Sequence, residues 1–483
     1  MDTLPSAPST ASGDLRGEEG RKTSIFRDST RYAVLLLSIV CMTLVTSNCL
    51  ILNFTIICMG SEDGNATSVY DYSQTEKGWL FSAVAIGALI GAVPITELIT
   101  HFGMRKVETV HGLISVVATL LSPLAASQGF IWLFAARIVQ GFAWTVAYSA
   151  TGEVPARWAT PKDKVTYMAY ISAYLQLAPV VTMPVAGAFC VSPIGWTGVY
   201  YLFGCLTLFS FILFYYFYRD CPSVHKTVSA KELGKIKSGL LKPAGKHRTP
   251  YLAIFKDITV IGVCLSWVGG SAAYQLLLQY GPTYLNKVLN YKIAQTGFAT
   301  ALPFLIALAV KICAGSFSDK ATCVGKRARI IAFTIAAQGT IAVCFLFLAL
   351  IPTNHSFAGW GAYAVAIASG GMNCVAMFKC AQLVCGQHIA FVMAVLSIIN
   401  SLNVLLLPPF VSFMVPTNAP DEWKKLFFCI SALVFVCNAF FIAVSKADPA
   451  PWTKETPTIV VNLEEDGDCQ PMKVLLDDRT NSE

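Results

Sequence analysis

Residues 131–158 read IWLFAARIVQGFAWTVAYSATGEVPARW, and the architecture can be worked out from this segment. A helix of about twenty such residues is long and apolar enough to span a bilayer, yet this one contains an arginine well inside. A guanidinium keeps its proton, so burying it in hydrocarbon costs about 3 kcal/mol or more unless it faces water or a partner. We therefore expect a membrane helix with one polar side.

The polar side of this helix is narrow. Its members step by three, four and seven residues, which places them on one face: Arg137, Gln140, Gly141, Trp144 and Tyr148. We expect this face to look into a cavity, where Arg137 binds an anion. The alternative is that Arg137 holds neighbouring helices together through their backbone carbonyls. Ionisable side chains inside membranes usually serve function, which favours the anion-binding interpretation.

The composition of the whole chain agrees with a membrane protein. Of its 483 residues, 55% are hydrophobic and only 13% are charged, and the mean hydropathy is +0.59. A soluble protein has about 25% charged residues, so we predict a helical protein that crosses the membrane many times. The net charge of +7 is concentrated in a few connecting loops, which indicates orientation rather than nucleic-acid binding.

The 16 cysteines lie mostly inside apolar runs and show no framework spacing. We expect them to be reduced, small hydrophobic residues, as at Cys49, Cys58, Cys205, Cys264 and Cys344. Cysteine and histidine do not occur with the spacing of a metal site, and no metal or cofactor is predicted. The polar N-terminal segment lacks the apolar core of a cleaved signal peptide.

Twelve apolar runs follow one another in two sets of six. The first set lies at about residues 33–58, 78–100, 107–127, 131–158, 166–190 and 197–218, and the second at about 257–281, 295–317, 329–351, 358–380, 388–414 and 424–446. We therefore divide the chain into a disordered cytosolic N-terminus (1–31), a first six-helix bundle (32–218), a solvated basic cytosolic linker (219–256), a second six-helix bundle (257–446) and a disordered cytosolic tail (447–483). Small residues at 87–91 predict close helix approach, and Pro179 and Pro184 predict a bend in the fifth run.

Basic residues indicate which side of the membrane each loop faces. With the N-terminus inside, the predicted cytosolic loops hold most lysines and arginines, and the opposite side holds only Lys77, Lys287, Lys292, Lys424 and Lys425. Both termini are therefore expected in the cytosol. Asn65, in a glycosylation sequon, is expected on the exoplasmic side. Lys311 and Lys379 are expected to extend their amines toward the cytosolic surface.

Two loops on the cytosolic side are predicted to form a gating latch. After the eighth run, residues 315–320 (GSFSDK) and 325–327 (GKR) combine an acid with several basic residues. The matching loop of the first half, residues 97–106 (ELITHFGMRK), has Thr100 where an acid is expected, and Glu97 can substitute one turn earlier. The predicted latch consists of Glu97, Arg105, Asp319, Lys320 and Arg327. The alternative for both loops is ordinary anchoring by positive residues.

Six plus six runs with a basic central loop, together with the loop at 315–327, resemble the major facilitator superfamily. Within it, the sequence resembles the anion:cation symporters, which include vesicular glutamate transporters, sialin and type I sodium–phosphate cotransporters. The matching residues are 136–141 (ARIVQG), 157–161 (RWATP), 183–187 (MPVAG), 195–196 (GW) and 279–285 (QYGPTYL). The resemblance covers about residues 32–446. It implies an all-α membrane fold of twelve transmembrane helices in two six-helix bundles.

The resemblance also implies a function, the secondary active transport of a small organic or inorganic anion by alternating access, driven by sodium, protons or the membrane potential. Arg137 matches an arginine that contacts the anion in this family. Because helices one, four, seven and ten line the cavity in the superfamily, the candidate substrate-binding residues are Arg137, Gln140, Trp144, Tyr148, Trp267, Tyr274 and Asn373. Asn400 and Asn403 on the eleventh run are expected to make hydrogen bonds between helices. The expected setting is a monomer in the plasma membrane or a vesicular or endolysosomal membrane, with the bilayer and a small anionic solute as its partners.

The sequence departs from the family at residues that couple anion transport to the movement of ions. Trp144 stands where several members have an acid, residues 78–81 lack the histidine of the vesicular members, and residues 264–267 lack an arginine. Proton coupling by those residues therefore cannot be inferred. Two other functions remain open, a facilitator of a neutral solute and a transport-inactive membrane protein that binds a ligand or partner. An enzyme is not predicted, because the chain has no convincing nucleophile–base pair, metal cluster or phosphate loop.

Overall fold

The computed structural model describes residues 28–59, 70, 72–160, 163–237, 250–320, 325–352, 355–446 and 448–453. Asn65 lies outside these residues, as do the side chains of Asp319, Lys320, Asn373 and Lys379. In the described part of the chain, eleven helices are long and apolar enough to cross a membrane. One expected span is not among these eleven. It is the tenth in chain order, α14 (Ser356–Cys385), a helix of 30 residues. The all-α, twelve-span architecture predicted from the sequence is confirmed.

The first bundle is organised around its fourth span. Its helices are α1 (Thr30–Met59), α2 (Gln74–Phe102), α3 (Met104–Gln128), α4 (Phe130–Trp158), α5 (Lys164–Ile171), α6 (Tyr174–Cys190) and α7 (Thr197–Phe217). Helix α4 packs against α1, α2 and α3. A Cβ atom on Gly87 would lie 1.9 Å from the carbonyl oxygen of Ile138, and one on Gly141 would lie 2.0 Å from that of Val84. The close approach predicted from the small residues of the second run is therefore confirmed, since only glycine fits at these two contacts.

The fifth span is broken at a position before its prolines. It consists of α5 and α6, which are separated at Ser172 and Ala173. Pro179 and Pro184 lie inside α6, so the bend expected at them stays a prediction, whereas the break lies at residues for which the sequence predicted none. At the break, the backbone N–H of Ala173 donates to the carbonyl of Tyr170, a tighter turn than that of an α-helix.

The second bundle contains the remaining spans. Its helices are α9 (Tyr251–Lys256), α10 (Ile258–Lys287), α11 (Ile293–Lys320), α12 (Lys326–Thr334), α13 (Thr340–Leu350), α14, α15 (Ile389–Met414) and α16 (Pro420–Val444). A π-helical turn at Ile335–Gly339 joins α12 to α13 within the ninth span. Asn438 of α16 accepts from the hydroxyl of Ser266 on α10 and donates to the side chain of Gln338 in the π turn. This buried hydrogen-bonded group fixes three elements of the bundle to one another.

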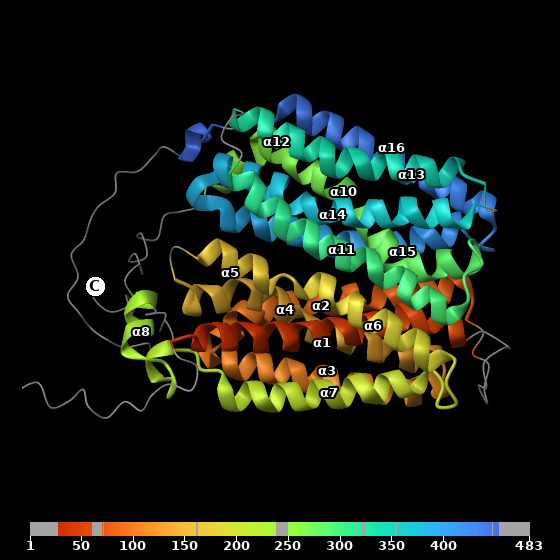
Figure 1. Ribbon diagram of the computed structural model, residues 1–483, viewed down its shortest axis with the longest axis horizontal. Helices are drawn as coiled ribbons and strands as arrows, with labels where there is room; N and C mark the ends of the chain where they lie inside the picture. The colour runs from red at the N-terminus through yellow and green to blue at the C-terminus, as the bar shows by residue number, and fades with distance from the viewer. Residues whose placement is uncertain are drawn as a thin grey trace, which may run out of the picture.

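The two bundles form two layers of nearly parallel helices (Figure 1). They meet where α6 packs on α11, α2 on α15 and α1 on α10. We call the end that holds the α1–α2 connection the outer end and the opposite one the inner end. Near the outer end, Ser412 donates to the carbonyl of Gln74, and Ser82 donates to the carbonyl of Leu405. The bundles are therefore held together by hydrogen bonds in their outer halves.

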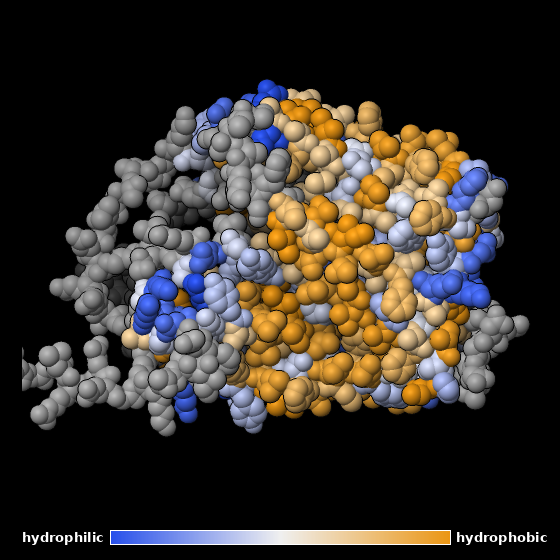
Figure 2. All heavy atoms as spheres, in the orientation of Figure 1, coloured by the Kyte–Doolittle hydropathy of each residue, from blue (hydrophilic) through white to orange (hydrophobic). Residues whose placement is uncertain are grey.

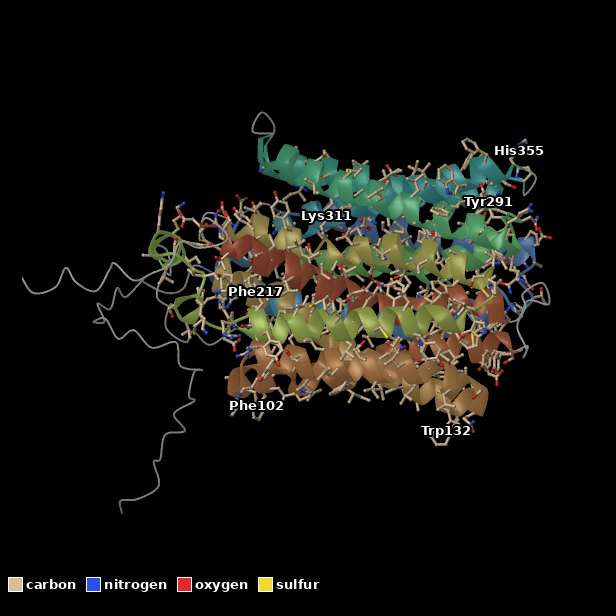
Figure 3. The ribbon with its side chains drawn as sticks, turned by 60° about the horizontal axis from the view of Figure 1, so that its bottom comes forward. Phe102, Trp132, Phe217, Tyr291, Lys311 and His355 are labelled. Carbon is tan, nitrogen blue, oxygen red and sulfur yellow. A yellow bond between two sulfur atoms is a disulfide. The ribbon has the colours of Figure 1, made fainter. Side chains whose placement is uncertain are left out.

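Apolar side chains cover the middle of the molecule, and polar ones cover its ends. Figure 2 shows hydrophobic residues in a broad band across the visible face, with hydrophilic residues at both ends of that band. Figure 3 places Phe102 and Phe217 at the inner end and Trp132, Tyr291 and His355 at the outer end. Large apolar side chains such as Val93 and Phe413 are exposed. This surface is suited to lipid, and the protein is a multi-pass integral membrane protein.

The basic interruption after α7 is only partly the solvated linker that the sequence predicts. Residues 219–237 include α8 (Ala230–Lys237), which lies beside the inner end of the first bundle (Figure 1). Glu232 is 1% exposed, and its carboxylate accepts from the backbone N–H groups of Thr30 at 3.3 Å and Arg31 at 2.9 Å. Because the first N–H groups of a helix lack intrahelical acceptors, this carboxylate stabilises the start of α1. The many lysines of this segment favour exposure to solvent, so the sequence did not predict that α8 docks on the start of α1.

Cys58 and Cys190 form a disulfide at the outer end, between α1 and the last residue of α6. The prediction of reduced cysteines is therefore wrong for Cys58. The two residues are 132 positions apart, and only the packing of α1 against α6 brings them together. The other cysteines that we used as examples are free, at Cys49, Cys205, Cys264 and Cys344.

Candidate functional site

Arg137 lies deep inside the first bundle, where α4 packs against α1 and α2. Its side chain is 1% exposed. Nε donates to the carbonyl of Leu80 at 3.3 Å, and Nη1 donates to the carbonyl of Cys49 at 2.8 Å and to Oε1 of Gln140 at 2.9 Å. These bonds connect α4 to α2 and α1. Arg137 thus lies inside packed protein and not beside the cavity that we expected. The alternative that we raised from the sequence, an arginine that holds helices through their carbonyls, describes the contacts that it makes here.

The charge of Arg137 has no counter-ion among the residues that the structure describes. The described ion pairs involve other side chains, and Nη2 of Arg137 donates to no described residue. Carbonyl dipoles solvate a guanidinium but do not neutralise it. A buried cation without a carboxylate is costly at membrane depth, and its field favours a bound anion.

Gln140 holds Arg137 in place. It is fully buried, and while Oε1 accepts from Arg137, Nε2 donates to Thr119 Oγ1 at 3.1 Å and Ser122 Oγ at 3.3 Å on α3. The polar atoms of the Gln140 side chain are therefore used inside the bundle. We expect Gln140 to position the guanidinium rather than contact a solute.

A second polar group, which we call the interbundle cluster, consists of Thr46, Trp144, Tyr148, Gln275 and Asn400. Trp144 donates to Thr46 Oγ1 at 3.1 Å, and its ring meets that of Tyr148 edge-on with centroids 5.0 Å apart. Asn400 donates to Tyr148 Oη at 3.1 Å and accepts from Gln275 at 3.3 Å. The cluster therefore joins α1 and α4 of the first bundle to α10 and α15 of the second, near the middle of the spans.

Trp267 and Tyr274 lie in the second bundle. Trp267 donates to the carbonyl of Leu396 on α15 at 3.0 Å, and the ring of Tyr274 meets that of Phe304 edge-on. Asn403 donates to Ser271 and to the carbonyl of Val268, so its predicted role as an interhelical hydrogen bond is confirmed. The side chain of Asn373 lies outside the described residues.

The residues of the polar face of α4 lie too far apart along the helix for one compact anion. With a rise of about 1.5 Å per residue, Trp144 lies about 10 Å from Arg137 along the helix axis, and Tyr148 about 16 Å. One compact anion cannot touch Arg137 and Tyr148 together in this structure. Helical periodicity correctly puts these residues on one side of α4, but it does not tell how far along the helix a solute reaches.

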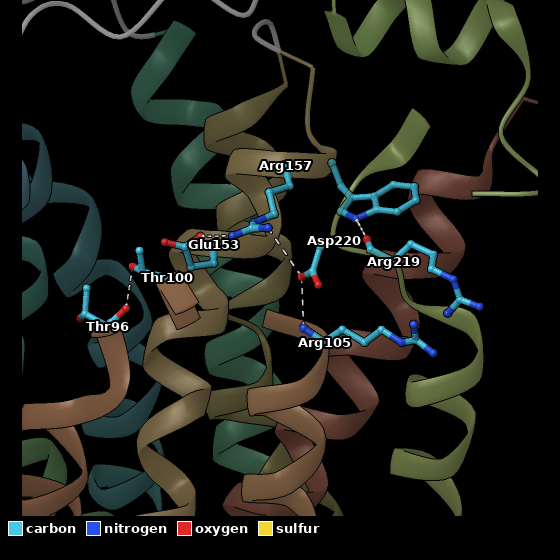
Figure 4. A network of polar contacts seen from close by, with 8 residues as sticks. Thr96, Thr100, Arg105, Glu153, Arg157, Arg219 and Asp220 are labelled. Atoms are coloured by element: carbon cyan, nitrogen blue, oxygen red, sulfur yellow. Dashed lines mark hydrogen bonds and ion pairs between the residues drawn. The ribbon is translucent and has the colours of Figure 1, made fainter. Parts of the chain in front are cut away.

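A polar network at the inner end involves Arg105 but not Glu97 (Figure 4). The backbone N–H of Arg105 donates to Asp220 at 3.1 Å, and Arg157 pairs with the same carboxylate at 3.6 Å and with Glu153 at 3.4 Å. Asp220, just after α7, thus supplies the acid that we expected from Glu97, which is exposed. Arg327 is also exposed, and Asp319 and Lys320 lie outside the described side chains. A latch between the two halves stays a prediction.

Lys311 contacts the other bundle instead of extending to the inner surface. It lies between the two ends of the molecule in Figure 3. Its amine donates to the carbonyl of Ser172 at 3.2 Å, to Ser172 Oγ at 2.7 Å and to Gln176 at 3.4 Å. The predicted orientation of Lys311 is therefore wrong, because the break between α5 and α6 offers it oxygen acceptors that the sequence did not reveal.

Two features of the structure were not predicted from the sequence. Lys77 of α2 and Lys287 of α10 help to line a pocket of about 80 Å³ at the outer end, between the bundles. Glu108 and His111 in α3 are 0% and 3% exposed. A signal for the second feature was present, an acid and a histidine three residues apart inside an apolar run.

Comparisons with known proteins agree with this fold. The model of the Major Facilitator Superfamily matches residues 35–408. Sodium-dependent phosphate transport protein 1 of Rattus norvegicus is 25% identical over 463 residues, covering 89% of this chain and 96% of that protein. Sialin of Homo sapiens is 23% identical over 393 residues, covering 79% of this chain and 78% of that protein.

Solved structures share the architecture at low sequence identity. A D-xylose-proton symporter is similar with a TM-score of 0.66 and 16% identity, covering 86% of this chain and 98% of that one. A bacterial homolog of the human lysosomal transporter Spinster, in an inward-facing and occupied conformation, gives a TM-score of 0.64 and 15% identity, covering 86% of this chain and 96% of that one. At such identities the likeness extends to the fold alone.

Proposed function

The chain belongs to the major facilitator superfamily, and from this premise we propose that it is a secondary active carrier of a small anion that works by alternating access. The anion binds in the first bundle at Arg137, and the interbundle cluster responds as the two bundles rock. The carrier is proposed to act as a monomer, and we assign it no enzymatic step.

The observation that supports this function most strongly is the buried guanidinium without a counter-ion. A charge at this depth costs about 3 kcal/mol when it has no compensation. The two N–H groups of Nη2 have no acceptor among the described residues, while Nε and Nη1 are fixed by carbonyls and by Gln140. A planar guanidinium with two unused N–H donors is suited to a carboxylate or phosphate oxygen.

The spacing of the polar residues along α4 favours an elongated organic anion. An anionic group on Nη2 of Arg137 leaves about 10 Å along the helix to Trp144, the nearest member of the interbundle cluster. A solute of that length, with an acid at one end and hydroxyl or apolar groups at the other, reaches both. The names of the relatives, sialin and a sodium-dependent phosphate transport protein, support anions as the class of solute.

We further propose that the outer end faces the exoplasm and that both termini are cytosolic. Disulfides form and persist in oxidising compartments, so the Cys58–Cys190 bond supports an exoplasmic location for the outer end. Hydrogen bonds from Ser412 and Ser82 close the outer halves of the two bundles. These contacts suit a conformation that opens toward the cytosol. The membrane is proposed to be the plasma membrane or a vesicular or endolysosomal one.

A second candidate is a facilitator of a neutral solute. The bonds from Arg137 to the carbonyls of Leu80 and Cys49 favour it, because they give the guanidinium a purely structural task. The two candidates differ in one measurable property. An anion carrier produces an electric current when solute is added to a supported membrane, unless its coupling ions balance the charge of the anion. A facilitator of neutral solutes produces no such current.

The test is uptake of a panel of labelled anions into proteoliposomes, with wild-type protein and Arg137→Gln. Arg219→Gln is the matched control, because Arg219 also donates to backbone carbonyls but lies at the inner end, outside the helical core. We expect saturable uptake of at least one organic anion by the wild type and the control, and loss of at least tenfold in Arg137→Gln. Undiminished uptake by Arg137→Gln would remove the assigned role.

A further inference from the structure

One face of α3 is polar along most of its length, although the helix crosses the membrane. Its members step by three or four residues and are all buried: Glu108, His111, Ser115, Thr119 and Ser122. Polar side chains at this depth are costly unless they are paired, so a continuous buried stripe calls for an explanation. We call it the α3 stripe.

The outer part of the α3 stripe is connected to Arg137. Thr119 and Ser122 accept from Gln140 Nε2, and Gln140 Oε1 accepts from Arg137. Further along, Ser115 accepts from Asn48 of α1 at 2.9 Å. Hydrogen bonds therefore run from the buried guanidinium onto the outer part of α3, and a separate bond from Asn48 reaches Ser115 nearer the inner end.

The inner part of the α3 stripe ends on two titratable groups, Glu108 and His111, that have buried polar atoms without a hydrogen-bond partner in the described chain. Neither carboxylate oxygen of Glu108 is bonded to any residue that the structure describes, and both are buried. His111 Nδ1 lies 2.9 Å from the carbonyl of Val107 and donates to it, which leaves the lone pair on Nε2. That nitrogen is buried and also has no partner in the described chain. The ring is stacked on Phe142 of α4.

These surroundings cannot hold an ionised carboxylate cheaply. A buried carboxylate that accepts no hydrogen bond loses its hydration and gains nothing in return, whereas a neutral carboxyl loses far less. The imidazole Nε2, one helical turn from Glu108, offers the nearest basic atom on the same face of α3. Glu108 and His111 therefore form a site whose chemistry is the binding of a proton.

Few other charges surround this pair. The Cys41 thiol of α1 and the Asp220 carboxylate after α7 interact electrostatically with Glu108. The Tyr218 hydroxyl, at the end of α7, is a third titratable neighbour. Asp220 is itself paired with Arg157 of α4. No described lysine or arginine pairs with Glu108, and both of its carboxylate oxygens are buried without a described partner.

We propose that Glu108 and His111 form a proton-binding site linked to anion binding at Arg137. The inference rests on the proposed function, because it assigns the carrier its coupling ion. The balance is simple: a proton from water at the inner end binds the Glu108 carboxylate, and an anion binds the guanidinium. The bundle takes up one positive and one negative charge, so each ligand favours the other.

The size of the linkage follows from the separation of the two charges. Glu108 and Thr119 are about 16 Å apart along α3, and Gln140 bridges the remaining gap, so the carboxyl and the guanidinium lie about 20 Å apart. With an effective dielectric constant of about 20, neutralising Glu108 raises the affinity of Arg137 for a monovalent anion about fourfold. By reciprocity, anion binding draws a proton onto the pair.

The first test does not need a substrate. Infrared spectra of the purified protein at neutral pH should contain the C=O absorption of a neutral, water-excluded carboxyl, and Glu108→Gln should remove it. Glu232→Gln is the matched control, because Glu232 is equally buried but its carboxylate is bonded by two backbone N–H groups outside the α3 stripe. The absence of this absorption from the wild type would overturn the proposal without any variant having to fold.

The second test measures anion affinity against pH for the best anion of the uptake panel. The wild type and Glu232→Gln should bind it about fourfold more tightly at low pH than at high pH and should take up protons on binding. Glu108→Gln should bind it with the tighter affinity at every pH and take up none. A pH dependence that persists in Glu108→Gln would overturn the linkage. If the wild type binds no anion, the proposed function fails, and the infrared result alone decides the proton site.

Discussion

Replacing Gly141 by alanine is expected to push α2 away from α4 and disturb Arg137. The new Cβ would lie 2.0 Å from the carbonyl oxygen of Val84, so the two backbones must part by about 1 Å to restore a normal contact. Overpacking of this kind costs about 1–3 kcal/mol, and the better helix propensity of alanine returns up to about 1 kcal/mol. We expect a net destabilisation of about 1–2 kcal/mol.

The same displacement acts on the proposed anion site. Leu80 lies one turn before Val84 on α2, and its carbonyl is already 3.3 Å from Nε of Arg137. A further separation of about 1 Å ends that hydrogen bond, because N–H···O bonds weaken steeply beyond about 3.2 Å. The guanidinium then loses one of its three fixed contacts, and anion affinity should fall along with stability.

The assay is thermal unfolding of the purified protein in detergent, together with anion binding. Gly152→Ala is the matched control, because Gly152 lies on the same helix with no atom within 4 Å of its added Cβ. The melting temperature of Gly141→Ala should fall, and that of Gly152→Ala should stay equal or rise. Equal melting temperatures and equal anion affinities for the two variants would refute the reasoning about the α2–α4 contact.

Three further predictions concern other parts of the molecule. Cys58→Ala should lower the free energy of unfolding by about 2–4 kcal/mol, and it should let a membrane-impermeant maleimide label Cys190 from the exoplasmic side, which the wild type allows only after reduction. Lys311→Met removes the amine that donates to Ser172 in the other bundle. Double electron–electron resonance between labels on the two bundles should then show the population of this conformation reduced about tenfold relative to the others. An unchanged distance distribution would contradict the assigned contact. Burial lowers the pKa of His225, so the docked segment that contains α8 favours the neutral imidazole. The stability of this docked segment is therefore lost as the pH falls below about 6.5. Hydrogen exchange in α8 should quicken below that pH in the wild type but not in His225→Phe.

The helical spans and their two-bundle division follow from the sequence because hydropathy and charge act locally. Twelve apolar runs and the basic interruption are readable without knowing which helices touch. The small residues at 87–91 also predict their own contact, since a glycine on a helix face signals a close neighbour. The break in the fifth span is different. Ser172 and Ala173 carry no breaking signal, whereas Pro179 and Pro184, which do, are accommodated inside α6.

Contacts between distant segments could not be read from the sequence. Three of these contacts join residues more than a hundred positions apart. Cys58 pairs with Cys190, Glu232 docks on the start of α1, and Asp220 accepts from the backbone of Arg105. Each depends on the order in which the helices pack. A local pattern can say that a side chain needs a partner, but it does not identify that partner.

The candidate site shows the same limit. The sequence identifies Arg137 as the unusual residue and predicts which residues share its side of α4, but it wrongly predicts a cavity beside Arg137 and Gln140, which are buried inside the first bundle. A helix rises about 1.5 Å per residue, so residues on one face can lie far apart along its axis. Arg137 and Gln140 therefore lie in the first bundle, whereas Trp144 and Tyr148 belong to the interbundle cluster. Glu108 and His111 were visible in the sequence as polar residues in an apolar run. Their significance emerges only from the missing hydrogen bonds, which no sequence pattern displays.

Ligand-induced stabilisation of purified protein tests most directly whether the Nη2 donors of Arg137 bind the anion. At about one hundred times the dissociation constant, a bound ligand adds about 2.7 kcal/mol to the free energy of unfolding. The wild type and Arg219→Gln should show a corresponding rise in melting temperature with the transported anion, and Arg137→Gln should show none. An equal rise in Arg137→Gln would mean that the anion binds elsewhere and that the guanidinium only holds helices together.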